Sequence, residues 1–544
     1  MLFKKQSRYK KNAGSISLII ILVIAAIVVV GGGAFVISGA ASKFVHSTFD
    51  SPQKYLSYVV KDDLMGKGSS SAASVVDKIG DTVLSSDTAM EEEITITIGE
   101  RGDKYLGLLK AQGLNLSWLE NAGVKYSVNA KDDLAEIKLK LTVNGKDIAS
   151  PSVIFDSKKY DLYFQIPEVS KETAKISLEE YADRFAEAFE KIEQMRDAFP
   201  DTKQVKKLMS KYLDIVLKQL DTVEKEKNAT LNVKGVSQNC TKLRVTIKEK
   251  QIKNVIKAVC EEVAKDKELK KIFVEYLDST GMSDYGVDPD EYWDKMLERL
   301  EEVEDRIEDY ELGLDKITLD LYLDGSGNVI GRVLTIVPED DVKVTAKIVC
   351  ATSKKDVGFE ASVEVEEHKV GIEGTGKLKG SKLTGEYALK YDGAKILKFD
   401  VENFDVKAYQ DGNLKGHFTC SLDDDLMDLM DSDLIYELPR DVRSMVRSIA
   451  QIGSSIDPGI DFIVDIQDKK HSIDIGIMDG DEDVFRIAFN GKIKNASKVK
   501  LPSKVVNLED EDEIEEFFSD LSWDNILDAL DDAGVPSSLL NQFH

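Results

Sequence analysis

The residues best suited to chemistry in this chain lie in a glycine-rich segment and in two short acidic loops. Residues 371–378, with the letters GIEGTGKL, come close to a phosphate-binding loop, in which backbone N–H groups surround a phosphate. The final Ser or Thr, which would supply a hydroxyl to magnesium, is replaced by Leu378. The segment also lies among alternating strand residues, with no helix after it to direct N–H groups at a phosphate. The pattern therefore favours a β-hairpin with glycines at turn or packing positions.

The two acidic loops offer the closely spaced oxygen atoms that calcium prefers. Residues 324–328 (DGSGN) begin like a calcium-binding loop, but Val329 stands where such a loop needs glycine, and the glutamate at its twelfth position is missing. Residues 479–483 (DGDED) form a second acidic turn between two strand patterns. At both places the spacing favours a solvated β-turn over a metal site.

The histidines and cysteines are too few and too scattered to form a catalytic or metal-binding motif. The five histidines show no HExxH spacing, and the chain has no GxSxG segment. His417 lies three residues from Cys420 on an expected strand, which places the two side chains on opposite faces. We therefore assign no catalytic, cofactor-binding or metal-binding residue, and we expect no cofactor and no enzymatic activity. Four cysteines leave three disulfide pairings open: Cys240, Cys260, Cys350 and Cys420.

The N-terminal segment indicates where the protein works. Residues 1–15 carry five basic side chains, and residues 16–41 contain no charged residue. As a helix, the second segment would be ~39 Å long, which exceeds the ~30 Å hydrocarbon core of a bilayer. We expect a cytoplasmic tail, a transmembrane helix over residues 16–41, and an extracytoplasmic body after it, because basic flanks stay in the cytoplasm. A cleaved signal peptide is the alternative, since Ser38-Gly39-Ala40 has the small residues of a cleavage site.

The composition supports a large globular body. The chain has 544 residues, of which 42% are hydrophobic and 31% are charged, so its length allows several domains. The formal net charge of −27 argues against a nucleic-acid-binding protein, which needs basic side chains to neutralise phosphates. The acidic surface is instead typical of a protein that must stay soluble.

Helix and strand patterns alternate in blocks after the expected membrane segment. Ser51-Pro52 predicts the start of a helix that ends near residue 65, and a second helix ends near residue 84. Asn144-Gly145 predicts a two-residue hairpin turn. Strand patterns cover residues 93–98, 124–167, 228–248, 317–422 and 462–489, and helical patterns cover residues 181–223, 252–307, 424–452 and 510–532.

These blocks predict an α+β fold in which large antiparallel sheets carry segregated amphipathic helices. We expect the following organisation after the membrane segment: a helical lead-in over residues 42–87, an α+β lobe over 88–313, a β-rich lobe over 314–500, and acidic C-terminal helices over 501–544. A single extended sheet is the alternative to two lobes, because no Pro-rich linker separates them.

Several short segments carry a resemblance to a known group of proteins. They are the basic tail, the glycine-rich end of the apolar run, and residues 51–55 (SPQKY), 162–168 (LYFQIPE) and 531–536 (DDAGVP). In these features the chain resembles large, uncharacterised, membrane-anchored proteins of Gram-positive anaerobic bacteria. The resemblance implies a single-pass protein of the plasma membrane whose body is extracytoplasmic, and it brings no catalytic residues with it.

From these observations we expect a non-enzymatic protein that binds or scaffolds at the bacterial cell surface. Its partners would be the membrane, through residues 16–41, and a lipid or a cell-surface protein, but no nucleic acid. A hydrophobic ligand is one option, because long antiparallel strands with amphipathic helices resemble the open half-barrels of lipoprotein carriers, a likeness of fold alone. The alternatives are a cell-wall glycan hydrolase with paired carboxylates and a calcium-dependent adhesion protein.

Overall fold

The computed structural model confirms a mostly β fold with some helices, at 49% strand and 28% helix. The residues that it describes are 50–65, 88–111, 116–182, 202–220, 222–280, 282, 286–339, 342–423, 425–426, 443–444, 447, 457–467, 469–509 and 511–541. The expected membrane segment 16–41, the second lead-in helix and most of the helices expected at 181–201 and 424–452 lie outside these residues. Within the described ranges, none of the helices has the length and apolar character needed to cross a bilayer.

The chain forms two compact units, and each unit is built from separate stretches of sequence. Unit 1 contains Met1–Ala73, Lys191–Lys377 and Lys390–Gly393. Unit 2 contains Ser74–Glu190, Leu378–Leu389 and Ala394–His544. Strand β15 (Lys382–Tyr391) contributes residues to both units.

The strands of unit 1 form an antiparallel sheet in which each strand pairs with the next in the chain. In order, they are β8 (Val223–Val233), β9 (Val236–Ile247), β10 (Leu314–Leu323), β11 (Val329–Pro338), β12 (Val344–Ser353), β13 (Asp356–Val365) and β14 (His368–Lys379). The pairing of β9 with β10 joins strands on either side of residue 313. Val223, which the sequence pattern places in a helix, begins β8 instead, because its buried side chain pairs in register with Val245.

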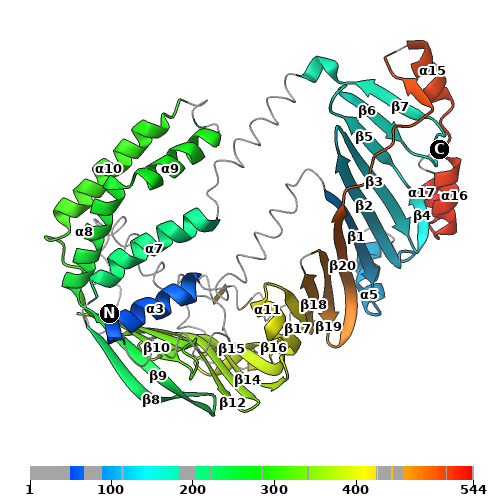
Figure 1. The fold of residues 1–544 in the computed structure, drawn as a ribbon. Helices are drawn as coiled ribbons and strands as arrows, with labels where there is room; N and C mark the ends of the chain where they lie inside the picture. Colours follow the sequence, from blue (N-terminus) through cyan, green and yellow to red (C-terminus); the bar gives the residue numbers. More distant parts are fainter. Residues whose placement is uncertain are drawn as a thin grey trace. The chain divides into compact units, whose positions relative to one another are not determined.

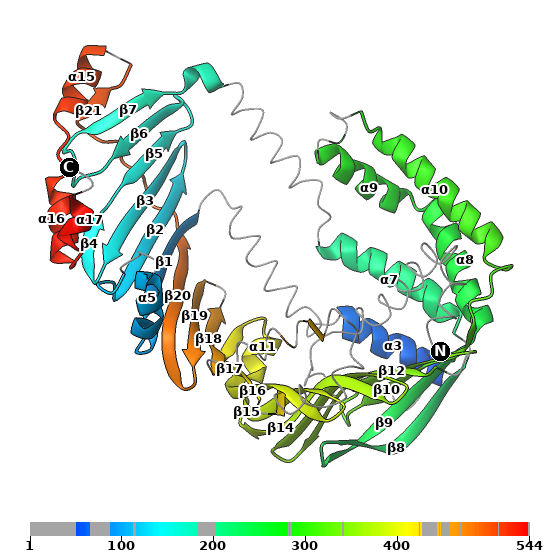
Figure 2. The ribbon, with the colours of Figure 1, turned by 180° about the vertical axis from the view of Figure 1, so that it is seen from behind.

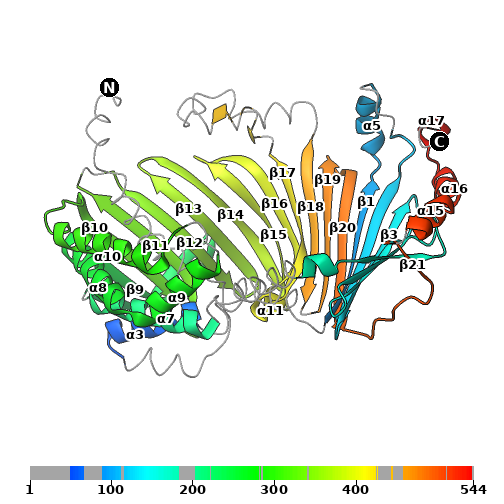
Figure 3. The same ribbon diagram turned by 90° about the horizontal axis from the view of Figure 1, so that it is seen from above.

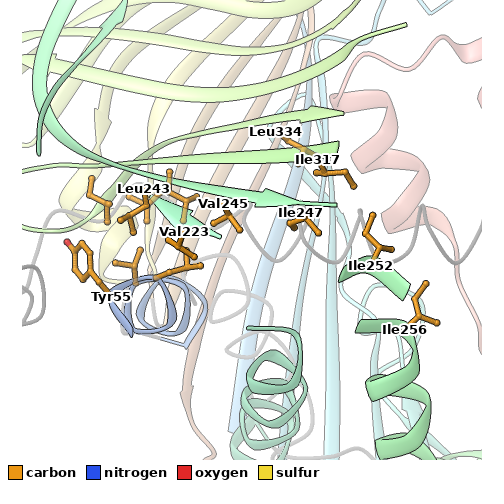
Figure 4. Close-up of a cluster of buried hydrophobic side chains, with 14 of the residues drawn as sticks. Tyr55, Val223, Leu243, Val245, Ile247, Ile252, Ile256, Ile317 and Leu334 are labelled. Carbon is orange, nitrogen blue, oxygen red and sulfur yellow. The ribbon is translucent and has the colours of Figure 1, made fainter. Parts of the chain in front are cut away.

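The core of unit 1 lies between this sheet and its helices. The helices are α3 (Pro52–Met65), α7 (Thr202–Lys218), α8 (Glu249–Lys265), α9 (Lys267–Ser279) and α10 (Pro289–Arg306). Tyr55 of α3 and Ile252 of α8 pack with strand residues such as Leu243, which is fully buried (Figure 4). The start of α3 is confirmed, since the Lys54 amide donates a hydrogen bond to Oγ of Ser51 at 3.3 Å.

The strands of unit 2 form an antiparallel sheet in which the first strand pairs with a strand from near the C-terminal end of the described chain. The first strand, β1 (Thr88–Ile98), lies between β20 (Glu482–Asn495) and β2 (Asn121–Lys131) (Figure 2), and Figure 3 shows β1 beside β20 from another side. On the β20 side the order continues through β19 (Lys470–Asp479), β18 (Pro458–Gln467), β17 (Leu414–Leu422) and β16 (Ala394–Asp405). On the β2 side it continues through β3 (Leu134–Val143), β5 (Ser152–Asp156), β6 (Asp161–Gln165) and β7 (Thr173–Ser177).

Two shorter strands and several helices complete unit 2. Strand β4 (Lys146–Ala149) pairs with β3, and β21 (Val505–Asn507) pairs with β7 in parallel. The helices are η2 (Glu179–Tyr181), α5 (Gly102–Ala111), α11 (Val406–Gln410), α15 (Glu511–Ser519), α16 (Asp524–Asp532) and α17 (Ser537–Leu540). Helix α16 contacts β4, and α15 contacts β21 (Figures 1 and 2). The expected hairpin turn is confirmed, because Asn144 and Gly145 both have positive φ angles, of 46° and 73°.

A buried carboxylate fixes the junction of three helices in unit 1. Oδ1 of Asp266 accepts hydrogen bonds from the amides of Glu268 and Leu269 at 3.0 Å, which caps the N-terminus of α9. Its Oδ2 accepts from Lys211 at 2.8 Å and from the Tyr212 hydroxyl at 3.0 Å, both on α7. Burial acts to raise the pKa of Asp266, but these hydrogen bonds outweigh it and hold the pKa below its usual value.

Replacing Asp266 should therefore destabilise unit 1 in a pH-dependent way. We expect Asp266→Ala to lower the free energy of unfolding by about 2–3 kcal/mol at neutral pH, because a cap and a charged hydrogen bond are lost together. Asp266→Asn should lower the free energy of unfolding by a smaller amount, since an amide oxygen still caps α9. Because the pKa of Asp266 is lower in the folded than in the unfolded state, its stabilisation is fully present above the pKa of the unfolded state. The stabilisation disappears as the pH falls through the two pKa values. Urea unfolding at pH 7 and pH 3 measures both effects, and an equal deficit at the two pH values would contradict the account.

Candidate functional site

The glycine-rich segment 371–378 lies within β14, which is a regular extended strand. It pairs with β13 in register, with Gly371 opposite Ser362 and Gly376 opposite Val357. A Cβ atom on Gly371 would lie 2.5 Å from the carbonyl oxygen of Ala361, so this glycine permits close packing between strands. An extended strand does not fold its N–H groups around a phosphate, and the segment acts as a packing strand, as its alternating residues indicate.

Both acidic loops use their carboxylates within the chain. Asp324 accepts hydrogen bonds from the amides of Ser326 and Asn328 at 2.8 Å, which closes a β-turn of the expected kind. The carboxylates of the second loop bind basic side chains of unit 2: Asp479 with Lys104, Glu482 with Arg101, and Asp483 with Arg486. A search of the described residues finds no group of three His, Cys, Asp or Glu side chains that could hold a metal ion.

The four cysteines are free thiols in separate elements. Burial raises the pKa of the Cys350 thiol to about 11, which keeps it protonated and unreactive at neutral pH. His417 and Cys420 lie on opposite faces of β17, as their spacing predicts. His417 is paired in register with Glu402, whereas Cys420 is paired with Phe399.

The feature of unit 2 that stands out is an apolar sheet face that extends across at least eight strands. Side chains alternate between the two faces of a strand, so the register decides which residues share a face. One row of register partners runs from β16 to β3, and at ~4.8 Å per strand it is roughly 34 Å long. Its members are all apolar: Val401, Phe418, Phe462, Ile475, Ile487, Ile96, Ala122 and Val143.

The neighbouring row on this face is equally apolar, and much of the face is exposed. Its members are Gly416, Val464, Ile473, Phe489, Ile94, Val124 and Leu141. The following residues of the face are 36–48% exposed: Ile96, Val124, Ile137, Leu139, Phe164, Ile176 and Ile460. The helices of unit 2 contact its strands at β4, β17, β20 and β21. An exposed apolar surface of this extent marks a binding surface more often than a bare face.

Polar side chains interrupt the apolar face at one place. The next row contains His471 on β19, Gly491 on β20, Glu92 on β1 and Tyr126 on β2. The Nε2 atom of His471 lies 3.0 Å from Oε1 and 2.9 Å from Oε2 of Glu92. The two side chains meet across Gly491, where a Cβ atom would lie 2.1 Å from Cε1 of His471 and 2.2 Å from Oε2 of Glu92. We call Glu92, His471 and Tyr126 the polar row.

The polar row is an acceptor-rich site in apolar surroundings. Glu92 is buried, with 7% of its surface exposed, while the His471 side chain is 30% exposed. Burial raises the pKa of Tyr126, and the nearby Glu92 carboxylate raises it further, so the phenol stays protonated. Lys492 and Lys494 flank this part of β20 on the reverse face, where both bind Glu91 at 2.7 Å.

The reverse face of the same strands carries a different kind of cluster, in which one guanidinium group binds three carboxylates. Arg486 donates hydrogen bonds to Asp483 at 2.7 Å, to Asp474 at 2.8 Å and to Asp461 at 2.5 Å. These carboxylates, Asp483 first, raise the pKa of Arg486. His417 also contacts Asp461. With all three guanidinium nitrogens engaged, Arg486 crosslinks strands β18, β19 and β20, and we assign it a structural role.

The carboxyl groups do not show the pKa pattern that a glycan hydrolase uses. Such an enzyme needs one acid whose pKa is raised, facing a second carboxylate across a cleft. Every carboxyl group of the described residues whose pKa clearly departs from its usual value has a lowered pKa, and Glu373, with ion pairs to Lys234 and Lys390, reaches about 2. None of these shifted carboxyl groups of the described residues is the acid with a raised pKa that the hydrolase alternative needs.

Sequence motifs did not identify the polar row, although one signal was present. Glu92 stands between two other glutamates, but it is separated from Ile94, Ile96 and Ile98 by even numbers of residues, so it shares their face of the strand. His471 likewise shares a strand face with Ile473, Ile475 and Ile477, because it is an even number of residues from each. A charged residue at an apolar position of an alternating strand is a candidate for function, but its partner is known only once the strand register is known.

Comparison with known proteins does not add to this geometry. No family model, no curated protein and no solved structure matches the chain. The functional argument therefore rests on the apolar face of unit 2 and its polar row.

The close approach across Gly491 can be tested with a pair of glycine substitutions. We expect Gly491→Ala to separate Glu92 from His471 and to lower the free energy of unfolding by about 1–3 kcal/mol, because a buried carboxylate loses its partner. Gly107→Ala is the matched control, since an added Cβ meets nothing within 4 Å on exposed helix α5. It should leave stability unchanged or raise it by up to about 1 kcal/mol. Urea denaturation measures both, and equal stability of the two variants would argue against the crowded site.

Proposed function

We propose that this chain is a membrane-anchored, extracytoplasmic protein that holds an acyl lipid on the apolar face of unit 2. The observation that carries the proposal is the pair of apolar rows that run across the sheet, in which most side chains are half-buried or exposed, while Val464 and Gly416 near the β17 end are buried. An antiparallel sheet can leave a polar face in water, but an apolar face needs a covering surface. An acyl chain offers an apolar cover without a requirement for matching hydrogen bonds.

The source of the lipid in this proposal is the membrane that anchors the chain. The proposal includes a transmembrane helix over residues 16–41, with the basic tail in the cytoplasm and both units outside. Such an anchor keeps the body at the membrane surface, where lipid is abundant. The acidic net charge of −27 favours an upright, soluble body over one that lies on an anionic membrane.

Simple energetics suggest that the face exchanges lipid with the membrane and does not store it permanently. Moving an acyl chain from the bilayer into water costs ~0.8 kcal/mol per CH₂ group, so a bare chain does not leave. A sheet face that covers one side of the chain returns only part of this cost. An acyl chain on the face is therefore less stable than one in the bilayer, so the bound lipid returns readily to the membrane.

The orientation of the body can be tested by chemical labelling of intact host cells. Lys265 and Lys271 have side chains that are 71% and 72% exposed, and a membrane-impermeant amine reagent should reach them. We expect mass spectrometry to find both lysines modified without cell lysis. A cytoplasmic protein of known location serves as the control for leakage. Labelling that appears only after lysis would contradict the extracytoplasmic part of the proposal.

Lipid contact can be mapped with a lipid whose acyl chain carries a photoactivatable diazirine. With the full chain in its host membrane, we expect crosslinks at apolar-face positions such as Ile94 and Ile96, because alternation points them at the ligand. Ile96→Asn should lower the crosslink yield several-fold. The neighbouring Thr97→Asn, on the reverse face, should leave it unchanged, and both residues are exposed, so neither change should unfold the chain. Equal crosslinking at both faces, or none, would overturn the proposal. Absence of crosslinks together with a dimer in solution would assign the face to a second copy.

A further inference from the structure

We infer that the polar row binds the head group of that lipid and selects an uncharged, hydroxyl-bearing head group over a phosphate. The inference rests on the proposed function, because it takes the acyl chain to lie on the apolar rows beside it. The shared chemistry is a hydroxyl donor on a neutral lipid, such as diacylglycerol. The two parts of the site match the two parts of such a molecule.

The position of the polar row sets the geometry of the bound lipid. Along β1, the rows of Glu92, Ile94, Ile96 and Ile98 follow one another at intervals of two residues. At ~3.4 Å per residue, the apolar stretch from Glu92 to Ile98 is roughly 20 Å long. One leaflet of a bilayer core is about 15 Å thick, so an acyl chain of ordinary length fits along the strand with its head group at Glu92.

The hydrogen-bond acceptor capacity of Glu92 explains why the head group should donate a hydrogen bond. An ionised carboxylate has about four acceptor positions, and the single imidazole of His471 does not fill those of Glu92. The Tyr126 side chain lies directly across the strand pair from Glu92 and presents a protonated phenol. A lipid hydroxyl can donate to Glu92 and accept from Tyr126. A buried acceptor that gains a donor in apolar surroundings is stabilised more than one in water.

Charge explains why a phosphate should be rejected. The head group would meet the Glu92 carboxylate in an environment of low dielectric, where repulsion between like charges is strong. Lys492 and Lys494, which follow Gly491 on β20, bind Glu91 on the reverse face. Lys470 and Lys125, which directly precede His471 and Tyr126, also belong to the reverse face, because they pair in register with Lys492 and Glu93. His471 already contacts both oxygens of Glu92 through Nε2.

The decisive experiment compares two lipids that differ only in the phosphate. Full-length protein is reconstituted into nanodiscs that contain diazirine-labelled diacylglycerol or diazirine-labelled phosphatidic acid with identical acyl chains. Crosslink yield to peptides of β1, β2 and β20 is measured by mass spectrometry. We expect the wild type to favour diacylglycerol by roughly tenfold, which corresponds to one charge-assisted hydrogen bond gained and one repulsion avoided.

A matched pair of variants connects the preference to the polar row. Glu92→Gln keeps the shape of the side chain and removes its charge, so the preference should fall to within about twofold. Glu91→Gln makes the same chemical change one residue away on the reverse face, and it should retain the wild-type preference. If Glu92→Gln lowers the melting temperature markedly, His471→Gln provides a second test. It keeps the carboxylate and removes the imidazole that faces it, so the preference for diacylglycerol should be retained or should rise.

Each outcome separates this inference from the proposed function. Equal yields for both lipids in the wild type would overturn head-group selection and leave lipid binding intact. A preference for phosphatidic acid would overturn the inference outright. The absence of crosslinks with either lipid would remove the proposed function itself. A preference that survives Glu92→Gln, or that is lost in His471→Gln, would place selection elsewhere and contradict the role of the polar row.

Discussion

The pairing of β1 with β20 is the interaction on which unit 2 depends. It runs in continuous antiparallel register from Thr88 opposite Asn495 to Ile98 opposite Phe485. Both apolar rows cross β1, and Glu92 reaches His471 only because β20 lies between β1 and β19. A slip of one residue would turn Glu91 and Glu93 into the apolar face and the isoleucines out of it. The alternation of residues in β1 therefore fixes the register, and the register creates the polar row.

Two glycines on neighbouring strands allow opposite charges to meet on opposite faces of this sheet. Gly491 on β20 lies between Glu92 and His471 on the apolar face. On the reverse face, a Cβ atom on Gly476 of β19 would lie 3.1 Å from Cζ of Arg486, which reaches past it to Asp461. A missing side chain costs packing within a strand, but here it permits an ion pair between strands that are not adjacent. In the Arg486 cluster all three guanidinium nitrogens are engaged, whereas in the polar row one imidazole nitrogen faces both oxygens of Glu92.

Local features of the chain could be predicted from sequence, and long-range features could not. The caps at Ser51 and Asp288, the turn at Asn144 and the left-handed Gly534 after α16 follow from residue type, because each depends on the conformation of a few neighbouring residues. The sequence patterns did not predict helix α5, which begins at Gly102. The partner of β1 is nearly 400 residues away, and many apolar strands could satisfy its alternation equally well. For that reason neither the discontinuous units nor the polar row could be derived before the register was known.

The discontinuity of unit 2 has a consequence for how the protein is made. A ribosome or translocon releases β1 early, then the stretch Lys191–Lys377 of unit 1, and only near the end β20. Until then β1 has one edge without its final partner, and isoleucine-rich edges of this kind attract wrong strands. Contacts this distant in sequence also form slowly. Unit 2 is therefore completed last, and a truncation that removes β20 leaves β1 without its neighbour although almost nine-tenths of the chain has been synthesised.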